Sequence, residues 1–168
     1  IKDDLNGDGN FNAVQPKTKR ISTDTSTTGQ TGVALLEDED GSGGLYLEKG
    51  SQLIEIIDIN GGSIDFPPVQ WGGIKKEQVV YAAEAVINNG TISSYNLLVQ
   101  ETETNIANSA TTIKWNMYSV SSTGVLDQAS KRSSEDPELF EKAVNEDLNN
   151  NNKIFTTDNV TLTAISTD

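Results

Sequence analysis

Residues 77–99 read EQVVYAAEAVINNGTISSYNLLV, and this stretch decides the fold class. The apolar residues of its first half fit both the spacing of a helix and the alternation of a strand. Asn89-Gly90 stands just before the alternating run of residues 92–99, and Asn-Gly between apolar runs is a strong short-range signal for a β-hairpin. We therefore predict a strand, and not a helix, over residues 77–87, paired with a second strand after the turn.

Short apolar segments on both sides of this hairpin extend the predicted sheet. Downstream, residues 113–120 alternate cleanly, with Trp115 on one face of a strand and Tyr118 on the other. Upstream, residues 33–36 and 45–47 flank an acidic turn and predict a second hairpin. Residues 53–59 predict one more strand, which ends at the turn signal Asn60-Gly61-Gly62.

One helix is predicted near the C-terminal end, over residues 137–146. Ser134 or Asp136 can cap it, and Pro137 suits the first helical position. The apolar residues of one face, which would pack on the sheet, are Phe140, Ala143, Val144 and Leu148. The predicted fold class is therefore mainly β, an antiparallel β-rich domain with one short C-terminal helix that leads into an Asp/Asn loop.

That loop, residues 147–158, carries oxygen-bearing groups at the spacing of an EF-hand calcium loop. Such loops take ligands from positions 1, 3, 5, 7 and 12. Those positions are held here by Asp147, Asn149, Asn151, the Lys153 carbonyl and Asp158. Because only the two Asp side chains bring charge, we expect weak calcium binding of the kind found in extracellular modules.

A second candidate loop lies near the N-terminus. The string Asp-Leu-Asn-Gly-Asp-Gly places Asp4, Asn6, Asp8 and the Asn10 carbonyl at the first four ligand positions. Calcium is the expected cofactor because the chain has no His or Cys, which leaves the hard oxygen ligands that calcium prefers. Asp, Asn and Gly also cluster in ordinary turns, and this is the alternative for both loops.

The two ends of the chain repeat one another. Residues 147–154 match residues 4–11, and Ile-Ser-Thr-Asp stands at both 21–24 and 165–168, so the two strings recur 143 and 144 residues apart. This pattern is typical of a tandem array. We expect residues 1–20 to end a preceding repeat, residues 21–158 to form a single β-rich repeat domain, and residues 159–168 to start the next repeat.

Composition excludes several function classes. The 168 residues hold 12 Lys plus Arg and 25 Asp plus Glu, a formal net charge of −13, and no His or Cys. Ser-His-Asp and Cys-His nucleophilic sites, disulfides and the usual zinc sites are therefore excluded, and we expect no enzyme. The negative charge repels nucleic acid, and no apolar run is long enough to insert in a membrane, so neither is an expected partner.

Several motifs together resemble a known family. They are Trp71-Gly72-Gly73-Ile74 with Glu77-Gln78 and Tyr81, then Trp115-Asn116, Gly124, Glu141 and Asn145-Glu146-Asp147-Leu148-Asn149. Over residues 71–155 the chain resembles the tryptophan-rich repeat domain of large cyanobacterial and proteobacterial secreted proteins, which are associated with haemolysin-type calcium-binding repeats. It departs from that pattern in its closing loop, where four Asn replace Gly-Asp-Gly. The resemblance implies a secreted or surface-displayed module of adhesin-like proteins.

The expected function is a calcium-binding repeat module with a structural and adhesive role, located extracellularly or on the cell surface. Its expected partners are neighbouring repeats of the same chain. The alternative is a carbohydrate-binding module for a surface polysaccharide, because aromatic rings stack on the apolar faces of sugars. The candidate ligand-binding residues are Trp71 and Trp115, with Tyr95 and Tyr118 as further aromatic candidates.

Overall fold

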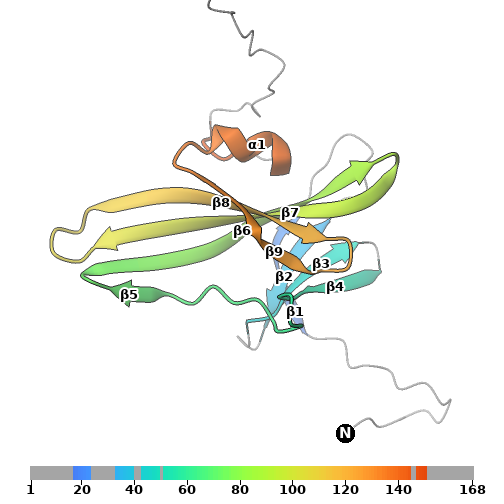
Figure 1. Ribbon diagram of the computed structural model, residues 1–168, viewed down its shortest axis with the longest axis horizontal. Coiled ribbons are helices and arrows are strands. Elements are labelled where there is room, and N and C mark those ends of the chain that lie inside the picture. The colour runs from blue at the N-terminus through green and yellow to red at the C-terminus, as the bar shows by residue number, and fades with distance from the viewer. Residues whose placement is uncertain (1–16, 24–32, 40–42, 50, 145–146, 151–168) are drawn as a thin grey trace, which may run out of the picture.

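The computed structural model describes residues 17–23, 33–39, 43–49, 51–144 and 147–150. This part of the chain forms two antiparallel sheets and one short helix near the C-terminal end (Figure 1). The predicted fold class, mainly β with one short C-terminal helix, is confirmed.

The larger sheet is built around the predicted Asn-Gly hairpin. Its strand order is β5-β6-β7-β8-β9. The strands are β5 (Val69–Trp71), β6 (Ile74–Asn88), β7 (Thr91–Asn105), β8 (Thr111–Ser121) and β9 (Leu126–Ser134). Asn89 and Gly90 form the two-residue turn between β6 and β7, with φ of 50° and 76°. The strand predicted over residues 77–87 is confirmed, and it is longer than predicted because it continues back to Ile74.

The smaller sheet contains the other predicted hairpin. Its order is β1-β2-β3-β4. The strands are β1 (Thr18–Thr23), β2 (Ala34–Asp38), β3 (Leu45–Lys49) and β4 (Gln52–Ile56). The pairing of β2 with β3 places Leu35 opposite Leu47, as the hairpin requires. β1 was not among the predicted strands, and its residues lie on both sides of the boundary expected between residues 20 and 21.

Apolar residues fill the space between the two sheets. Leu35 and Leu47 of the smaller sheet meet Leu97, Val99 and Val120 of the larger one, and all five are fully buried. Removing such side chains from water is the main stabilising contribution to a fold of this size, at about 1.5–3 kcal/mol for each. The core therefore holds the smaller sheet against one face of the larger sheet.

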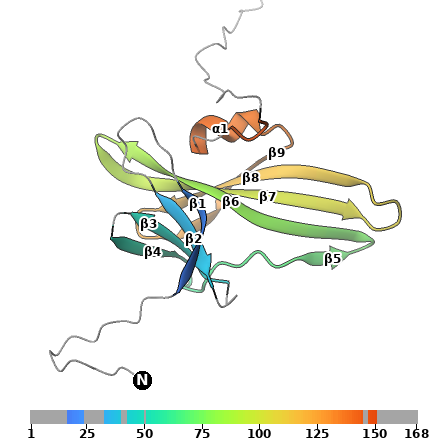
Figure 2. The ribbon, with the colours of Figure 1, turned by 180° about the vertical axis from the view of Figure 1, so that it is seen from behind.

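The helix α1 (Glu138–Val144) covers part of the opposite face of the larger sheet (Figure 2). Its first turn is capped by Asp136, whose Oδ1 accepts the N–H of Glu138 at 3.0 Å. The predicted apolar face is confirmed, because Phe140, Val144 and Leu148 pack in one cluster with Trp115. The helix begins at Glu138, one residue later than predicted, and residues 145–146 of the predicted range lie outside the described residues.

The two sheets meet along two seams, and only one of them is hydrogen-bonded. Beyond β4, the N–H of Ile57 donates to the Gly124 carbonyl at 2.9 Å, and the N–H of Leu126 donates to the Ile57 carbonyl at 2.8 Å. On the other side β1 lies close to β6, but no described residue of β1 pairs with it. The described residues therefore form a sandwich that is closed at one seam and open at the other.

Candidate functional site

Most of the candidate calcium ligands lie outside the described residues. These are Asp4, Asn6, Asp8 and Asn10 of the N-terminal loop, and Asn151, Lys153 and Asp158 of the C-terminal loop. Asp147 and Asn149 are described, and they follow α1 as predicted. In the part of the chain that the structure describes, no three Asp or Glu side chains are grouped closely enough to hold a metal ion.

Hydrogen bonds from the helix hold the first residues of the C-terminal loop. The buried Glu141 accepts a hydrogen bond from the backbone N–H of Leu148 at 3.2 Å, and Glu138 accepts one from the side-chain amide of Asn149 at 2.8 Å. Asn150 then adopts a left-handed φ of 58°, which Asn tolerates better than most residues. The helix thus holds Leu148 and Asn149 at the beginning of the loop.

The same junction is attached to the larger sheet. Asn96 of β7 donates its side-chain N–H to the Ala143 carbonyl at 3.0 Å, which satisfies one of the carbonyls that the end of a helix leaves unpaired. Leu148 is buried in the cluster under the helix. A loop that follows this junction is therefore positioned relative to the core and not only relative to the helix.

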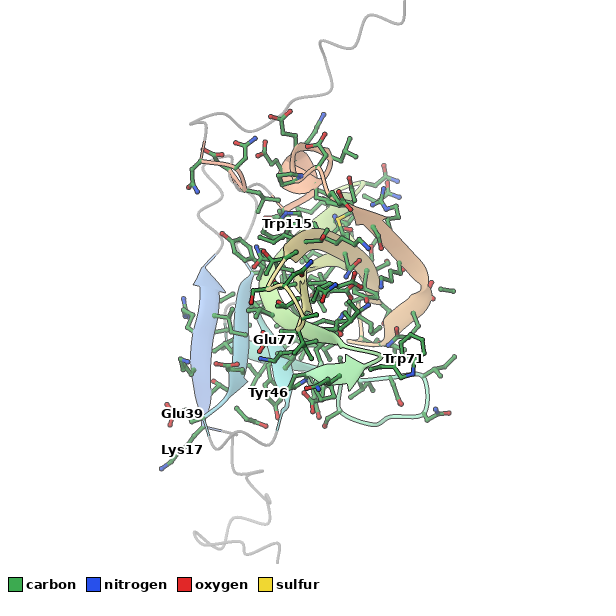
Figure 3. All side chains as sticks on the ribbon, turned by 90° about the vertical axis from the view of Figure 1, so that its left-hand side faces the viewer. Lys17, Glu39, Tyr46, Trp71, Glu77 and Trp115 are labelled. Atoms are coloured by element: carbon green, nitrogen blue, oxygen red, sulfur yellow. The ribbon has the colours of Figure 1, made fainter. Side chains whose placement is uncertain are left out.

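Trp71 is the exposed tryptophan. It ends β5, next to a tight turn in which Gly72 and Gly73 have φ of 58° and 80°, and 81% of its surface is accessible. Val69 on the same strand is also exposed. Figure 3 shows Trp71 well separated from Trp115. The structure therefore presents one tryptophan at the tip of a hairpin, and Trp71 stays a predicted ligand-binding residue.

Trp115, the other candidate ligand-binding residue, is part of the core. Only 5% of its surface is accessible, and its ring meets Tyr81 edge to face, with the centroids 5.1 Å apart. The helix packs over it through Phe140. Tyr95 and Tyr118 are buried as well. These three rings cannot stack on a sugar, because each is used in packing.

Charged groups gather on the outer part of the larger sheet, where β6, β7 and β8 extend past the smaller sheet. The buried Glu101 accepts hydrogen bonds from Lys76 at 3.1 Å, Gln78 at 3.0 Å and Asn116 at 3.3 Å. Glu103 pairs with Lys76 at 2.9 Å. Its carboxylate, followed by that of Glu101, raises the pKa of Lys76, and Lys76 in turn lowers the pKa of Glu103. These contacts join β6, β7 and β8 through their side chains.

A cleft of about 550 Å³ lies at the open seam, and sequence patterns did not predict it. Its walls come from the edges of β1 and β6, and its floor includes Ile64 and Phe66. Its size is typical of ligand sites. No local signal in the sequence marks it, because it forms where two sheets meet that are far apart in the chain.

No helix in the described ranges combines the length and the apolar character needed to cross a membrane. Comparison of the chain with protein-family models, with curated proteins and with solved structures finds no match in any of the three.

Proposed function

We propose that this chain is an extracellular repeat module of a long bacterial surface or secreted adhesin-like protein, with a structural and adhesive role and with calcium bound at its Asp/Asn loops. One observation carries the proposal. Ile21-Ser22-Thr23 forms the end of β1, the first described strand, and the same string recurs at residues 165–167, after α1, the last described element. The interval between the two copies therefore contains every described strand and helix except the beginning of β1.

The positions of the first and last elements support a linear array. β1 lies on one side of the larger sheet and α1 on the other, as both ribbon views show (Figures 1 and 2). A unit whose first described strand lies on one side of the sheet and whose last described element lies on the other could be followed by a neighbouring unit without the chain turning back. Stacked units of this kind contact mainly their neighbours, which makes the rigidity of each junction decisive.

Calcium would act at that junction. Glu141 and Glu138 accept hydrogen bonds from Leu148 and Asn149 at the beginning of the loop. An ion bound between Asp147 and the later ligand positions would extend this order toward the next unit. The ion would also neutralise carboxylates in a chain whose net charge is −13. Removing calcium would then loosen the array at each junction.

Calorimetric titration of the chelator-treated chain with calcium tests this function. We expect heat of binding and a melting temperature that rises with calcium, because a ligand that binds only the folded state stabilises it by RT ln(1 + [L]/Kd). Asp8→Ala and Asp147→Ala should each remove the signal of one loop. Glu135→Ala, which removes an exposed carboxylate elsewhere, is the matched control. Absence of both heat and stabilisation at millimolar calcium would reject the calcium site.

A second candidate function, carbohydrate binding, is favoured by the exposure of Trp71. A sugar stacking on this ring would change its fluorescence, while Trp115 inside the core would contribute a constant background. Titration with oligosaccharides of bacterial surface polymers should shift the emission of the native chain and not that of Trp71→Ala. Val69→Ala controls for changes in the neighbouring apolar surface. An unchanged emission across the sugars would reject this candidate.

A further inference from the structure

The open seam presents two strand edges whose backbone groups have no strand partner among the described residues. β5 pairs with β6 only over Ile74–Lys76. Upstream of β5 the chain runs through Pro67-Pro68, which lack the N–H that a further ladder would need. From Glu77 onward the outer edge of β6 is therefore unpaired in the described structure. The outer edge of β1, the last strand of the smaller sheet, is unpaired in the same sense.

The cleft of about 550 Å³ lies between these two edges. It is lined by three consecutive residues of each strand, Lys19, Arg20 and Ile21 of β1 and Gln78, Val79 and Val80 of β6. Successive side chains of a strand point to opposite faces, so a cavity that touches three in a row meets the strand at its edge. The ligand that matches a strand edge is another extended main chain.

The floor of the cleft is apolar and continues into the core. Leu45 and Ile64 are buried there, and Ile21, Phe66 and Val80 pack against the same cluster. In contrast, Val79 at the rim is 59% exposed. The cleft can therefore take one apolar side chain between the sheets while the rest of a bound chain stays near the surface.

The charges at the rim favour a basic partner. Lys19 pairs with Glu37 at 3.1 Å, and Arg20 pairs with Glu48. Both basic side chains of the cleft therefore already form an ion pair with a carboxylate. Asp65 lines the cleft and makes no ion pair with any described residue. With a chain charge of −13, the surroundings attract cations and repel acidic segments.

From these observations we propose that the open seam binds an extended basic peptide segment of a partner protein, which adds to the edge of β6 from Val79 onward, inserts one apolar side chain between the sheets and places a Lys or Arg beside Asp65. Main-chain hydrogen bonds would supply affinity, and the apolar floor and Asp65 would supply specificity. The proposal depends neither on the calcium loops nor on the tandem array, so either can fail without the other.

The probe is the blocked pentapeptide acetyl-Lys-Thr-Phe-Thr-Lys-amide, titrated into the ¹⁵N-labelled chain and followed by NMR. Alternation places Phe and both Lys on one side of the strand. We expect amide shifts confined to the seam, at Gln78–Val80 and Lys19–Ile21. The Glu-Thr-Phe-Thr-Glu peptide should bind at least about tenfold more weakly, because it places a carboxylate where the basic peptide places a Lys beside Asp65.

Backbone methylation separates strand addition from simple side-chain binding. Alternate N–H groups of a strand point to opposite edges, so N-methylation of the two Thr amides and N-methylation of the Phe and second Lys amides remove different sets of donors. One form should lose binding and the other should keep it. Equal binding of both forms would overturn strand addition.

Two tryptophan substitutions complete the test. Val79→Trp should block the cleft, while Val69→Trp, at another exposed valine outside it, should leave binding unchanged. Asp65→Asn should weaken binding of the basic peptide. It should not weaken binding of a peptide in which Thr replaces both Lys. Near-ultraviolet circular dichroism checks that each variant folds. No shift at the seam with millimolar peptide, or shifts at the seam with cellohexaose but not with the peptide, would overturn the proposal.

Discussion

Among the described glycines, Gly124 has a backbone atom nearest to the position of an added Cβ. Its φ is +94°, and a Cβ there would lie 2.1 Å from the Glu55 carbonyl oxygen. Its own carbonyl accepts the N–H of Ile57, one of the bonds that close the seam between the sheets. The close approach of these backbones depends on the absence of a side chain.

Gly124→Ala should therefore lower the free energy of unfolding by about 2 kcal/mol or more, because strained backbone and displaced contacts both contribute. Gly90→Ala is the matched control: its φ is also positive, +76°, but a Cβ there meets nothing within 4 Å. Only the conformational cost of about 1–2 kcal/mol should remain for Gly90. Urea unfolding of both variants measures the difference, and equal losses would contradict the role of the close approach.

Two buried tyrosines predict how stability depends on alkaline pH. Burial raises the pKa of Tyr95 above its ordinary 10.0, and burial with the nearby charge of Glu101 does the same for Tyr118. A pKa that is higher in the folded state means that the stabilisation is complete below the unfolded value of about 10 and is lost as pH rises through the folded value. The raised pKa of Lys76 acts in the same direction.

Tyr95→Phe should therefore make the fall in melting temperature above pH 10 less steep, because one group no longer has to ionise inside the core. Tyr81→Phe, which removes the hydroxyl of an exposed ring, is the matched control. Thermal unfolding followed at intervals from neutral to strongly alkaline pH gives both slopes. If the two variants showed the same slope as the native chain, burial of Tyr95 would not control alkaline unfolding.

At the scale of elements, the helix α1 depends on its contact with the sheet. Seven residues are too few to form a stable helix in water, so packing must hold it. Phe140 supplies that packing against Trp115, while Leu139 beside it is 63% exposed. The two neighbours therefore have opposite environments on one helical turn.

Phe140→Ala is expected to cost about 3–5 kcal/mol, the range for removing a buried aromatic ring, and to release the loop that carries Asp147. Leu139→Ala should change stability by less than about 0.5 kcal/mol, as surface substitutions do. Chemical denaturation gives both values, and the fluorescence of Trp115 reports whether its cover is lost. A small effect of Phe140→Ala would show that the helix contributes little to the fold.

For the whole molecule, the excess of 13 negative charges opposes the compact state. We expect the melting temperature of the calcium-free chain to rise with sodium chloride, because salt screens repulsion over a Debye length of about 10 Å at 0.1 M. Calcium and magnesium chloride at equal ionic strength separate screening from binding. Equal stabilisation by both would indicate screening alone, and an additional effect of calcium would indicate a specific site.

Local signals in the sequence predicted the elements whose character is local. The Asn89-Gly90 turn, the alternation around Trp115 and the apolar face of α1 each depend on residues close together in the chain, and each is confirmed. β1 and β9 gave no such signal, because exposed edge strands rich in Ser, Thr, Lys and Arg lack the alternation that marks a half-buried strand.

The sequence by itself thus determined the fold class, the central hairpin, the packing face of the helix and the exclusion of thiol and imidazole chemistry. Only the tertiary structure decided that Trp115 is core while Trp71 is exposed, because the two residues differ in what packs over them. It also decided which seam is closed and where the cleft lies. These features arise where segments distant in the chain meet, and a local pattern carries no information about such meetings.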